Sequence, residues 1–162
     1  MIKKMLIIIF VLLLSCSYSV YTNSYPYLKT IKIATFSNNT TEYELEENLL
    51  LKLTDLFEKD GRLKIVDLNP DCKLEGEILD YSNKIYSYGN ENVDEYEVKI
   101  LFKIIFTDLK KNKILYQNNS LVLSETYSGS NELSEFKTEE EAQNKIYQDL
   151  FDTIMKESLE EW

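Results

Sequence analysis

The sequence contains no histidine, two cysteines and four glycines among 162 residues. Histidine is the most common general base and the most common metal ligand in proteins, so nucleophilic triads and zinc sites built on imidazole are excluded. None of the four glycines stands in a phosphate-binding arrangement such as GxGxxG. A hydrolase or transferase is therefore disfavoured, and we expect a protein that is not an enzyme and carries no metal and no cofactor.

Basic residues are also scarce. The chain has 18 lysines and arginines against 28 acidic residues, which gives a formal net charge of −10. A chain with this charge repels nucleic acids and anionic surfaces in general. We therefore expect no nucleic-acid partner.

The amino-terminal residues carry the three parts of a secretory signal. Lys3 and Lys4 precede an apolar run over 5–14, and the small residue Ser15 follows. A ten-residue helix is about 15 Å long, roughly half the thickness of a bilayer core, so this run is too short to span a membrane. The segment is thus expected to direct export and then to be removed.

Cys16 distinguishes this signal from an ordinary one. The tetrad Leu13-Leu14-Ser15-Cys16 looks like a bacterial lipobox. The resemblance implies cleavage after Ser15, a diacylglycerol on the Cys16 thiol and acylation of the new amino group. It also implies, since Ser17 rather than Asp follows the cysteine, export to a Gram-negative outer membrane. The alternative is an incidental cysteine at an ordinary secretory cleavage site.

The expected organisation is a lipoprotein signal peptide over 1–15, a lipidated amino terminus and tether over 16–26, and one α+β domain over 27–162. Removing 1–15 leaves 16 basic residues (18 less Lys3 and Lys4) against 28 acidic ones, a net charge of −12. With Cys16 acylated, Cys72 has no partner for an intramolecular disulfide. We expect Cys72 to be a small buried apolar residue.

Two helices are predicted from capping boxes and helical spacing. Thr41-x-x-Glu44 precedes the first, which Asp60-Gly61 should end, and Thr138-x-x-Glu141 precedes the second, which should run close to Trp162. The expected buried positions are Leu45, Leu49, Leu53, Leu56 and Phe57 in the first helix, and Ala142, Ile146, Tyr147, Leu150, Phe151, Ile154 and Met155 in the second.

Strands are predicted over 31–36, 62–66, 73–85, 95–106 and 113–127, and a turn-rich loop over 87–92. The 95–106 run alternates apolar and charged residues with period two, as expected when one face of a sheet is covered. The alternation in 113–127 slips, which indicates a bulge near 117–119. The expected fold is α+β, a two-layer sandwich with two amphipathic helices on one face of a mostly antiparallel or mixed sheet of four to five strands. The other face should be left for water or a partner.

Several short sequence segments, taken in their order along roughly 27–162, resemble those of the LptE family of lipopolysaccharide-assembly lipoproteins. They include Phe36-x-Asn38-x-Thr40 before the first helix, Asp60-Gly61-Arg62-Leu63 after it and Leu74-x-Gly76-x-Ile78 in the third strand. Asn92-Val93-x-Glu95-Tyr96 and the hairpin Asp108…Lys113-x-Leu115 complete the pattern. The 27–162 segment is therefore expected to be an LptE-like domain.

The resemblance implies a role as the plug and assembly subunit of a large outer-membrane β-barrel of the LptD type, which delivers lipopolysaccharide to the outer leaflet. The protein would be lipid-anchored in the outer membrane, with its domain in the periplasm or inside the barrel lumen. Predicted partner contacts on the free sheet face and its loops are Tyr81, Tyr86, Tyr88, Asn90, Asn92 and Tyr96, which are otherwise ordinary surface residues. Predicted lipopolysaccharide contacts are Lys110, Lys111 and Lys113, which are otherwise a solvated turn.

One alternative from another class stays open. Periplasmic lipoproteins that regulate cell-wall synthases or form part of a secretion pore also begin with a strand like 31–36, followed by Asn, Thr and a helix. The helix ending near Trp162 and the long strand over 96–106 fit the lipopolysaccharide-assembly family better.

Overall fold

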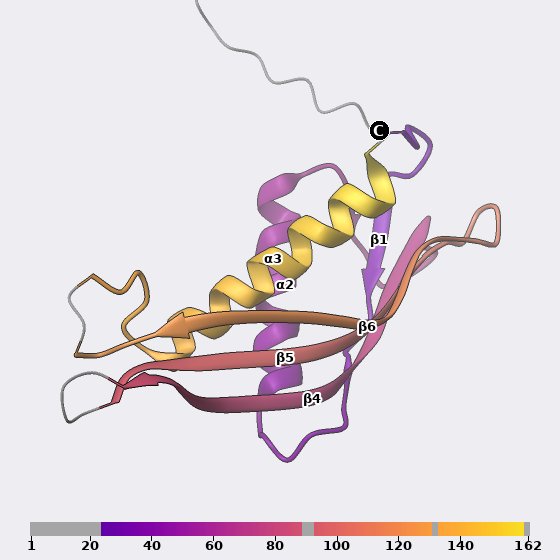
Figure 1. The fold of residues 1–162 in the computed structure, drawn as a ribbon. Helices are drawn as coiled ribbons and strands as arrows, with labels where there is room; N and C mark the ends of the chain where they lie inside the picture. The colour runs from indigo at the N-terminus through magenta and orange to yellow at the C-terminus, as the bar shows by residue number, and fades with distance from the viewer. Residues whose placement is uncertain (1–23, 89–92, 131–132, 161–162) are drawn as a thin grey trace, which may run out of the picture.

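The computed structural model describes residues 24–88, 93–130 and 133–160 (Figure 1). The predictions for the signal peptide, for cleavage after Ser15 and for Cys16 therefore lie outside the described residues. In the described part of the chain, neither helix combines the length and the apolar character that crossing a bilayer requires.

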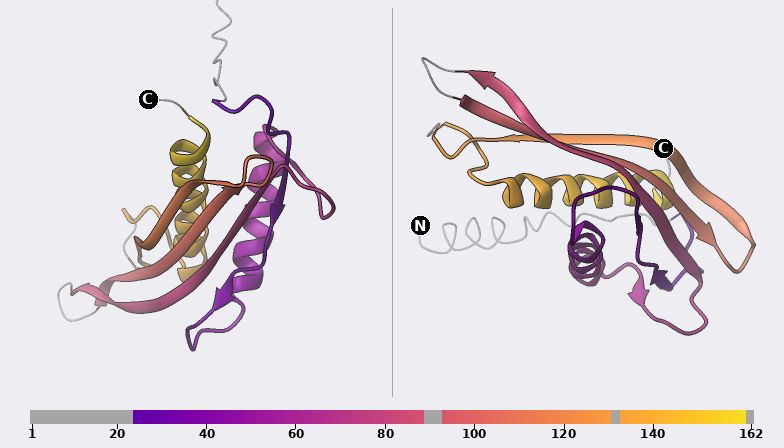
Figure 2. Two further views of the ribbon diagram at one scale, coloured as in Figure 1. Left: turned by 90° about the vertical axis from the view of Figure 1, so that its right-hand side faces the viewer. Right: turned by 90° about the horizontal axis from the view of Figure 1, so that it is seen from below.

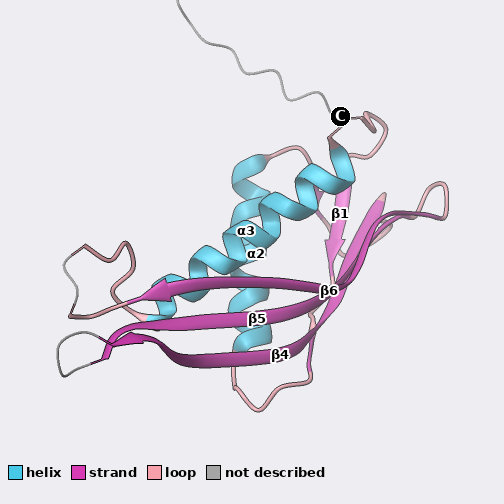
Figure 3. Ribbon diagram, viewed as in Figure 1, coloured by secondary structure: helices cyan, strands magenta, loops and turns pink. Residues whose placement is uncertain are grey.

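The described residues form an α+β fold of six strands and two helices (Figure 3). The elements are β1 (Thr30–Ile33), β2 (Ser37–Asn38), α2 (Leu45–Asp60), β3 (Lys64–Ile65), β4 (Cys72–Tyr88), β5 (Val93–Asp108), β6 (Lys113–Tyr127) and α3 (Glu139–Leu159). The predicted fold class is confirmed. The sheet has one strand more than expected because Ser37–Asn38, just after the run predicted over 31–36, form the short strand β2.

The sheet is mixed, with the strand order β3-β1-β4-β5-β6 and β2 beside β4. β1 pairs in parallel with β3 and β4, and β2 pairs in parallel with β4. The long strands β4, β5 and β6 are antiparallel neighbours. β6 is the last strand of the described sheet, so one of its sides has no strand partner there.

Both helices cover the same face of the sheet (Figure 2). α2 lies against β1, β2 and β3, whereas α3 lies along β5 and β6. The helices contact each other through the rings of Phe57 and Phe151, whose centroids are 4.9 Å apart at an interplanar angle of 86°. This edge-to-face pair joins the two halves of the core.

The core lies between this layer of helices and the sheet. Every predicted apolar position of the two helices is buried. In β5 the alternation is also confirmed, because its even-numbered residues from Val98 to Phe106 are fully buried while Lys99 is exposed. Cys72 is a buried free thiol at the start of β4, as expected, and burial raises its pKa to about 12.

The two predicted capping boxes have different outcomes. At α3 the Thr138 hydroxyl accepts a hydrogen bond from the backbone N–H of Glu141, and the Glu141 carboxylate accepts one from the backbone N–H of Thr138. At α2 the prediction was wrong, because Glu44 is itself the N-cap. Its φ of 65° is left-handed, whereas a capping side chain requires an extended backbone. The Asn38 amide instead donates to the Glu42 carbonyl and to the Glu46 carboxylate.

The predicted helix stop and the predicted bulge are both confirmed. Gly61 follows α2 in the left-handed conformation, with a φ of 71°. In β6 the register passes from Phe102 opposite Leu121 to Ile104 opposite Asn118, which leaves one extra residue in β6. A further register shift between Ile78 and Asp80 in β4 had no counterpart in the predictions.

Candidate partner-binding surfaces

The two predicted sites lie at opposite ends of the long strands. Tyr86, Tyr88 and Tyr96 lie where β4 ends and β5 begins, and we call this region the tyrosine end. The hairpin that carries Lys110, Lys111 and Lys113 joins β5 to β6, and we call it the lysine end. Tyr96 and Asp108 are twelve positions apart in β5, which corresponds to about 40 Å at about 3.3 Å per residue. One compact ligand cannot contact both ends.

The tyrosine end presents aromatic side chains to solvent. The exposed fraction is 74% for Tyr88 and 61% for Tyr86. Tyr96 stacks on Tyr127 of β6 with ring centroids 5.3 Å apart, and the Tyr127 hydroxyl accepts a hydrogen bond of 2.9 Å from the Asn83 amide. Exposed aromatic area with hydrogen-bonding tips is typical of protein recognition surfaces. Asn90 and Asn92, predicted to belong to this surface, lie outside the described residues.

Tyr81 lies on the helix-covered face rather than on the free face where it was predicted. Its hydroxyl donates to the Glu139 carboxylate at the start of α3 and accepts a 2.9 Å hydrogen bond from the Gln143 amide. The register shift between Ile78 and Asp80 explains this position, because the extra residue turns odd-numbered side chains toward the helices. Burial and the bond to Glu139 raise the pKa of Tyr81 above its ordinary value.

The lysine end is held against the amino-terminal segment by its own contacts. Lys110 Nζ lies 2.9 Å from Asp71 Oδ1 and donates to the Tyr27 carbonyl over 3.1 Å. Lys111 Nζ lies 4.2 Å from the centroid of the Tyr27 ring. The Asp108 carboxylate accepts hydrogen bonds from the Tyr27 hydroxyl and from the backbone N–H of Lys111. Two of the three lysines therefore already have partners within the chain, and Lys113 is exposed.

Asp71 lies at the centre of these contacts. Its carboxylate pairs with Lys110 and accepts the backbone N–H groups of Lys29 and Thr30 at 2.7 and 3.0 Å. Lys110 and these two N–H groups lower the pKa of Asp71 to about 2. Sequence reasoning missed Tyr27, Asp71 and Asp108, because they are distant from one another in the sequence and no local pattern marks them.

The described chain begins at the lysine end. The Ser24 N–H donates to the carbonyl of Leu159, the last residue of α3, over 3.0 Å. Three residues later Tyr27 contacts the lysine hairpin. The amino-terminal segment therefore joins the domain at this end of the sheet.

The described residues contain no group of three or more histidine, cysteine, aspartate or glutamate side chains placed to hold a metal ion. The tyrosine end offers exposed aromatic rings for contact with a partner. The lysine end offers a hairpin whose Lys110 and Lys111 already have partners within the chain.

A family model described as lipopolysaccharide-assembly, LptE, matches residues 28–158 of the chain. Comparison with curated proteins gives no match. Among solved structures, the hypothetical protein CT253 from Chlamydia trachomatis is similar, with a TM-score of 0.58 at 10% identity, over 81% of this chain and 98% of that one.

Protein XCC0632 from Xanthomonas campestris has a TM-score of 0.55 at 8% identity, over 80% of this chain and 84% of its own. At these identities the two structures show a shared fold.

Proposed function

The chain belongs to the LptE family of lipopolysaccharide-assembly proteins, and from this we propose that it is the non-enzymatic, lipid-anchored partner of a large outer-membrane β-barrel that delivers lipopolysaccharide to the cell surface. The observation that carries the proposal is the family match, which spans almost the whole described domain. The absence of histidine from the sequence agrees with a role in binding rather than catalysis.

The position of the amino-terminal segment supports an orientation for the anchored protein. If Cys16 carries the acyl chains, it lies eight positions before Ser24 at the lysine end. Eight extended residues span at most about 28 Å. The lysine end then lies near the leaflet that holds the anchor, and the tyrosine end can lie about 40 Å farther away. The exposed rings would thus be presented to the lumen of the barrel, whose wall is polar.

The lysine end is the proposed contact for the phosphates of lipopolysaccharide. Lys110 is paired with Asp71, so its charge is largely compensated. Exposed Lys113 is the better candidate for a phosphate contact, because an ammonium binds phosphate as a point charge. Lys111 would have to leave the face of the Tyr27 ring to take part.

Co-purification from outer membranes tests the proposed partner. The variant Tyr86→Ala/Tyr88→Ala should reduce recovery of the barrel about tenfold or more, as expected when interface aromatics are removed. Tyr43→Ala is the matched control, because Tyr43 is 87% exposed and lies just before α2 rather than where β4 ends and β5 begins. Recovery of the unaltered protein without any large β-barrel would contradict the proposal.

Depletion of the protein in cells separates the two functional classes. Loss of lipopolysaccharide from the cell surface is the expected result. Altered peptidoglycan with normal surface lipopolysaccharide would instead favour the regulator of cell-wall synthases.

A further inference from the structure

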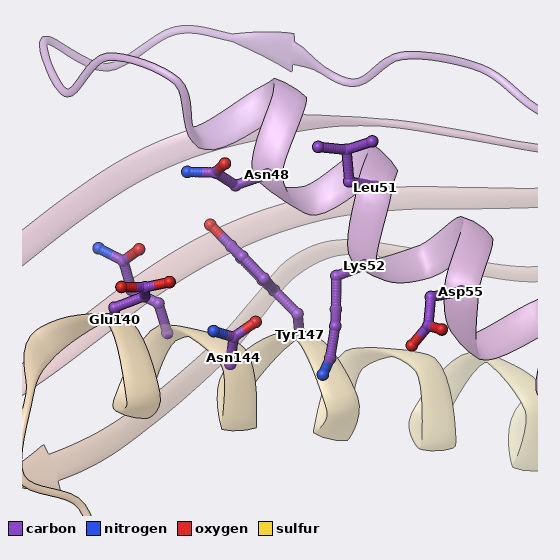
Figure 4. Close-up of a pocket in the computed structure, with 8 residues that line it drawn as sticks. Asn48, Leu51, Lys52, Asp55, Glu140, Asn144 and Tyr147 are labelled. Carbon is purple, nitrogen blue, oxygen red and sulfur yellow. The ribbon is translucent and has the colours of Figure 1, made fainter.

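A polar groove lies between α2 and the amino-terminal half of α3. Its volume is about 320 Å³, and its lining includes Asn48 and Leu51 of α2 and Glu140, Gln143, Asn144 and Tyr147 of α3. Figure 4 shows Tyr147 reaching from α3 toward Asn48 on the facing helix. The groove therefore has a floor made by a large side chain and walls made by amides and carboxylates.

The Tyr147 hydroxyl is unusual for a buried polar group. The residue is 1% exposed, and its hydroxyl has no hydrogen-bond partner within the described residues. A buried hydroxyl without a partner is destabilising, because it has lost its hydrogen bonds to water. Burial raises the pKa of Tyr147, so the hydroxyl stays protonated and remains a donor. A ligand with an acceptor oxygen would supply the missing partner.

The rim of the groove adds an aromatic ring, amides and a carboxylate to the Tyr147 hydroxyl. A second hollow of about 500 Å³ shares Asn48, Glu140 and Gln143 with the first and extends to Tyr43, whose ring is almost fully exposed. The amides of Asn48 and Asn144 each offer donors and an acceptor, and Glu140 offers acceptors. Amides and carboxylates beside an exposed aromatic ring match the hydroxyl groups and the apolar faces of a sugar.

The charge around the groove restricts the ligand further. Seven glutamates lie at or beside the first turns of the two helices: Glu42, Glu44, Glu46, Glu47, Glu139, Glu140 and Glu141. Against them the lining offers one lysine, Lys52. This field disfavours phosphorylated or carboxylated ligands. Leu51 is the one aliphatic residue of the lining, so the groove lacks the row of apolar anchors that an amphipathic helix requires.

We infer that the groove between α2 and α3 binds an uncharged saccharide of one or two rings, with the Tyr147 hydroxyl donating to a sugar oxygen and the amides of Asn48 and Asn144 bonding further hydroxyls. This site shares no residue with the tyrosine end or the lysine end and does not depend on the proposed barrel partner.

Nuclear magnetic resonance titration of the acylated protein tests the inference, in a detergent without a sugar headgroup. The probes are N-acetylglucosamine, its β1,4-linked disaccharide and maltose, with glucose 6-phosphate as the anionic comparison. At least one uncharged probe should cause saturable shifts in the side-chain amide signals of Asn48 and Asn144. Glucose 6-phosphate should bind at least tenfold more weakly. If no uncharged probe shifts these signals, or if the phosphate binds equally well, the inference is wrong.

Two variants locate the site. Tyr147→Phe and Asn48→Ala should each weaken binding about fivefold, as expected for the loss of one neutral hydrogen bond. Gln117→Ala is the control, because Gln117 is exposed on β6 and should leave affinity unchanged. Asn48 is exposed, so its variant reports on binding even if a change at Tyr147 disturbs folding. Unchanged affinity in Asn48→Ala would overturn the inference.

Discussion

Gly76 shows how closely β4 is packed against the core at one point. A Cβ atom on this residue would lie 2.3 Å from the carbonyl oxygen of Lys103 and 2.5 Å from Cε1 of Phe36. Phe36 is buried between β1 and β2, so its ring occupies the space that any side chain at position 76 would need. Both residues belong to sequence segments on which the family resemblance rests. Their close contact explains why these two residue types occur together in the fold.

Gly76→Ala should therefore destabilise the protein by about 1–3 kcal/mol, the usual range for overpacking. Urea unfolding followed by circular dichroism measures the change in the free energy of unfolding. Gly129→Ala is the matched control, because the nearest atom to its added Cβ is 3.7 Å away. Equal effects of the two substitutions would show that the contact with Phe36 is not tight.

Asp71 makes the stability of the lysine end dependent on pH. Its pKa is lowered from 3.8 to about 2 in the folded protein, so its stabilising effect is fully present above about pH 4 and is lost as pH falls through 2. Asp71→Asn should lower the free energy of unfolding at pH 7 by roughly 1–2 kcal/mol, because it weakens bonds to a charged acceptor. The difference from the unaltered protein should shrink between pH 4 and pH 2 in unfolding experiments. A difference that stays constant over this range would exclude the carboxylate as its source.

At the scale of the elements, the two helix starts offer a paired experiment. Thr138→Ala should lower the free energy of unfolding by about 1 kcal/mol, because it removes the hydroxyl that caps α3. Thr41→Ala is the internal control, since the N-cap of α2 is Glu44, no side chain caps that helix, and Thr41 is exposed. Thermal unfolding monitored at 222 nm compares the two variants. A loss in Thr41→Ala as large as that in Thr138→Ala would contradict the structure at α2.

Periodicity predicted the helices and β5 because burial dictates the residue type at each of their positions. Val98 to Phe106 alternate without interruption, and the stripe from Ala142 to Met155 keeps one helical face. The start of α2 was not predictable in this way, because Glu44 is the N-cap in a left-handed conformation and Asn38 holds the preceding loop by donating to the Glu42 carbonyl and the Glu46 carboxylate. The bulge at Leu79 also has no turn residue to mark it, so the position of Tyr81 emerges only from pairing with β5.

At the scale of the whole molecule, the sequence predicted which residues the candidate surfaces contain, but it did not predict which residues contact them. The exposed tyrosines lie beside the loop where the sequence suggested them. The lysine hairpin, in contrast, is braced by Tyr27 and Asp71, which lie 83 and 39 residues before Lys110. Contacts over such distances leave no local pattern, so the sequence indicated a free basic loop where the fold pairs it.

The proposed anchor makes a prediction for the whole protein. Cys16→Ser should abolish acylation and move the protein from the membrane fraction to the soluble periplasmic fraction, because the acyl chains would be its membrane attachment. Mass spectrometry of the amino-terminal peptide and immunoblots of the fractions measure both effects. Cys72→Ser should leave both unchanged, since Cys72 is buried in the core. An unacylated natural protein would contradict the proposed anchor.

The outer side of β6 has a consequence for handling the isolated protein. From Ile114 to Ser124 this strand has no charged residue and no proline, and the strand lies at the margin of the described sheet. An unpaired, uncharged edge strand of this kind can pair with the same strand of another copy. Concentrated protein purified without a partner should therefore form thioflavin-positive fibrils. A lysine introduced as Val122→Lys should lengthen the lag before they form.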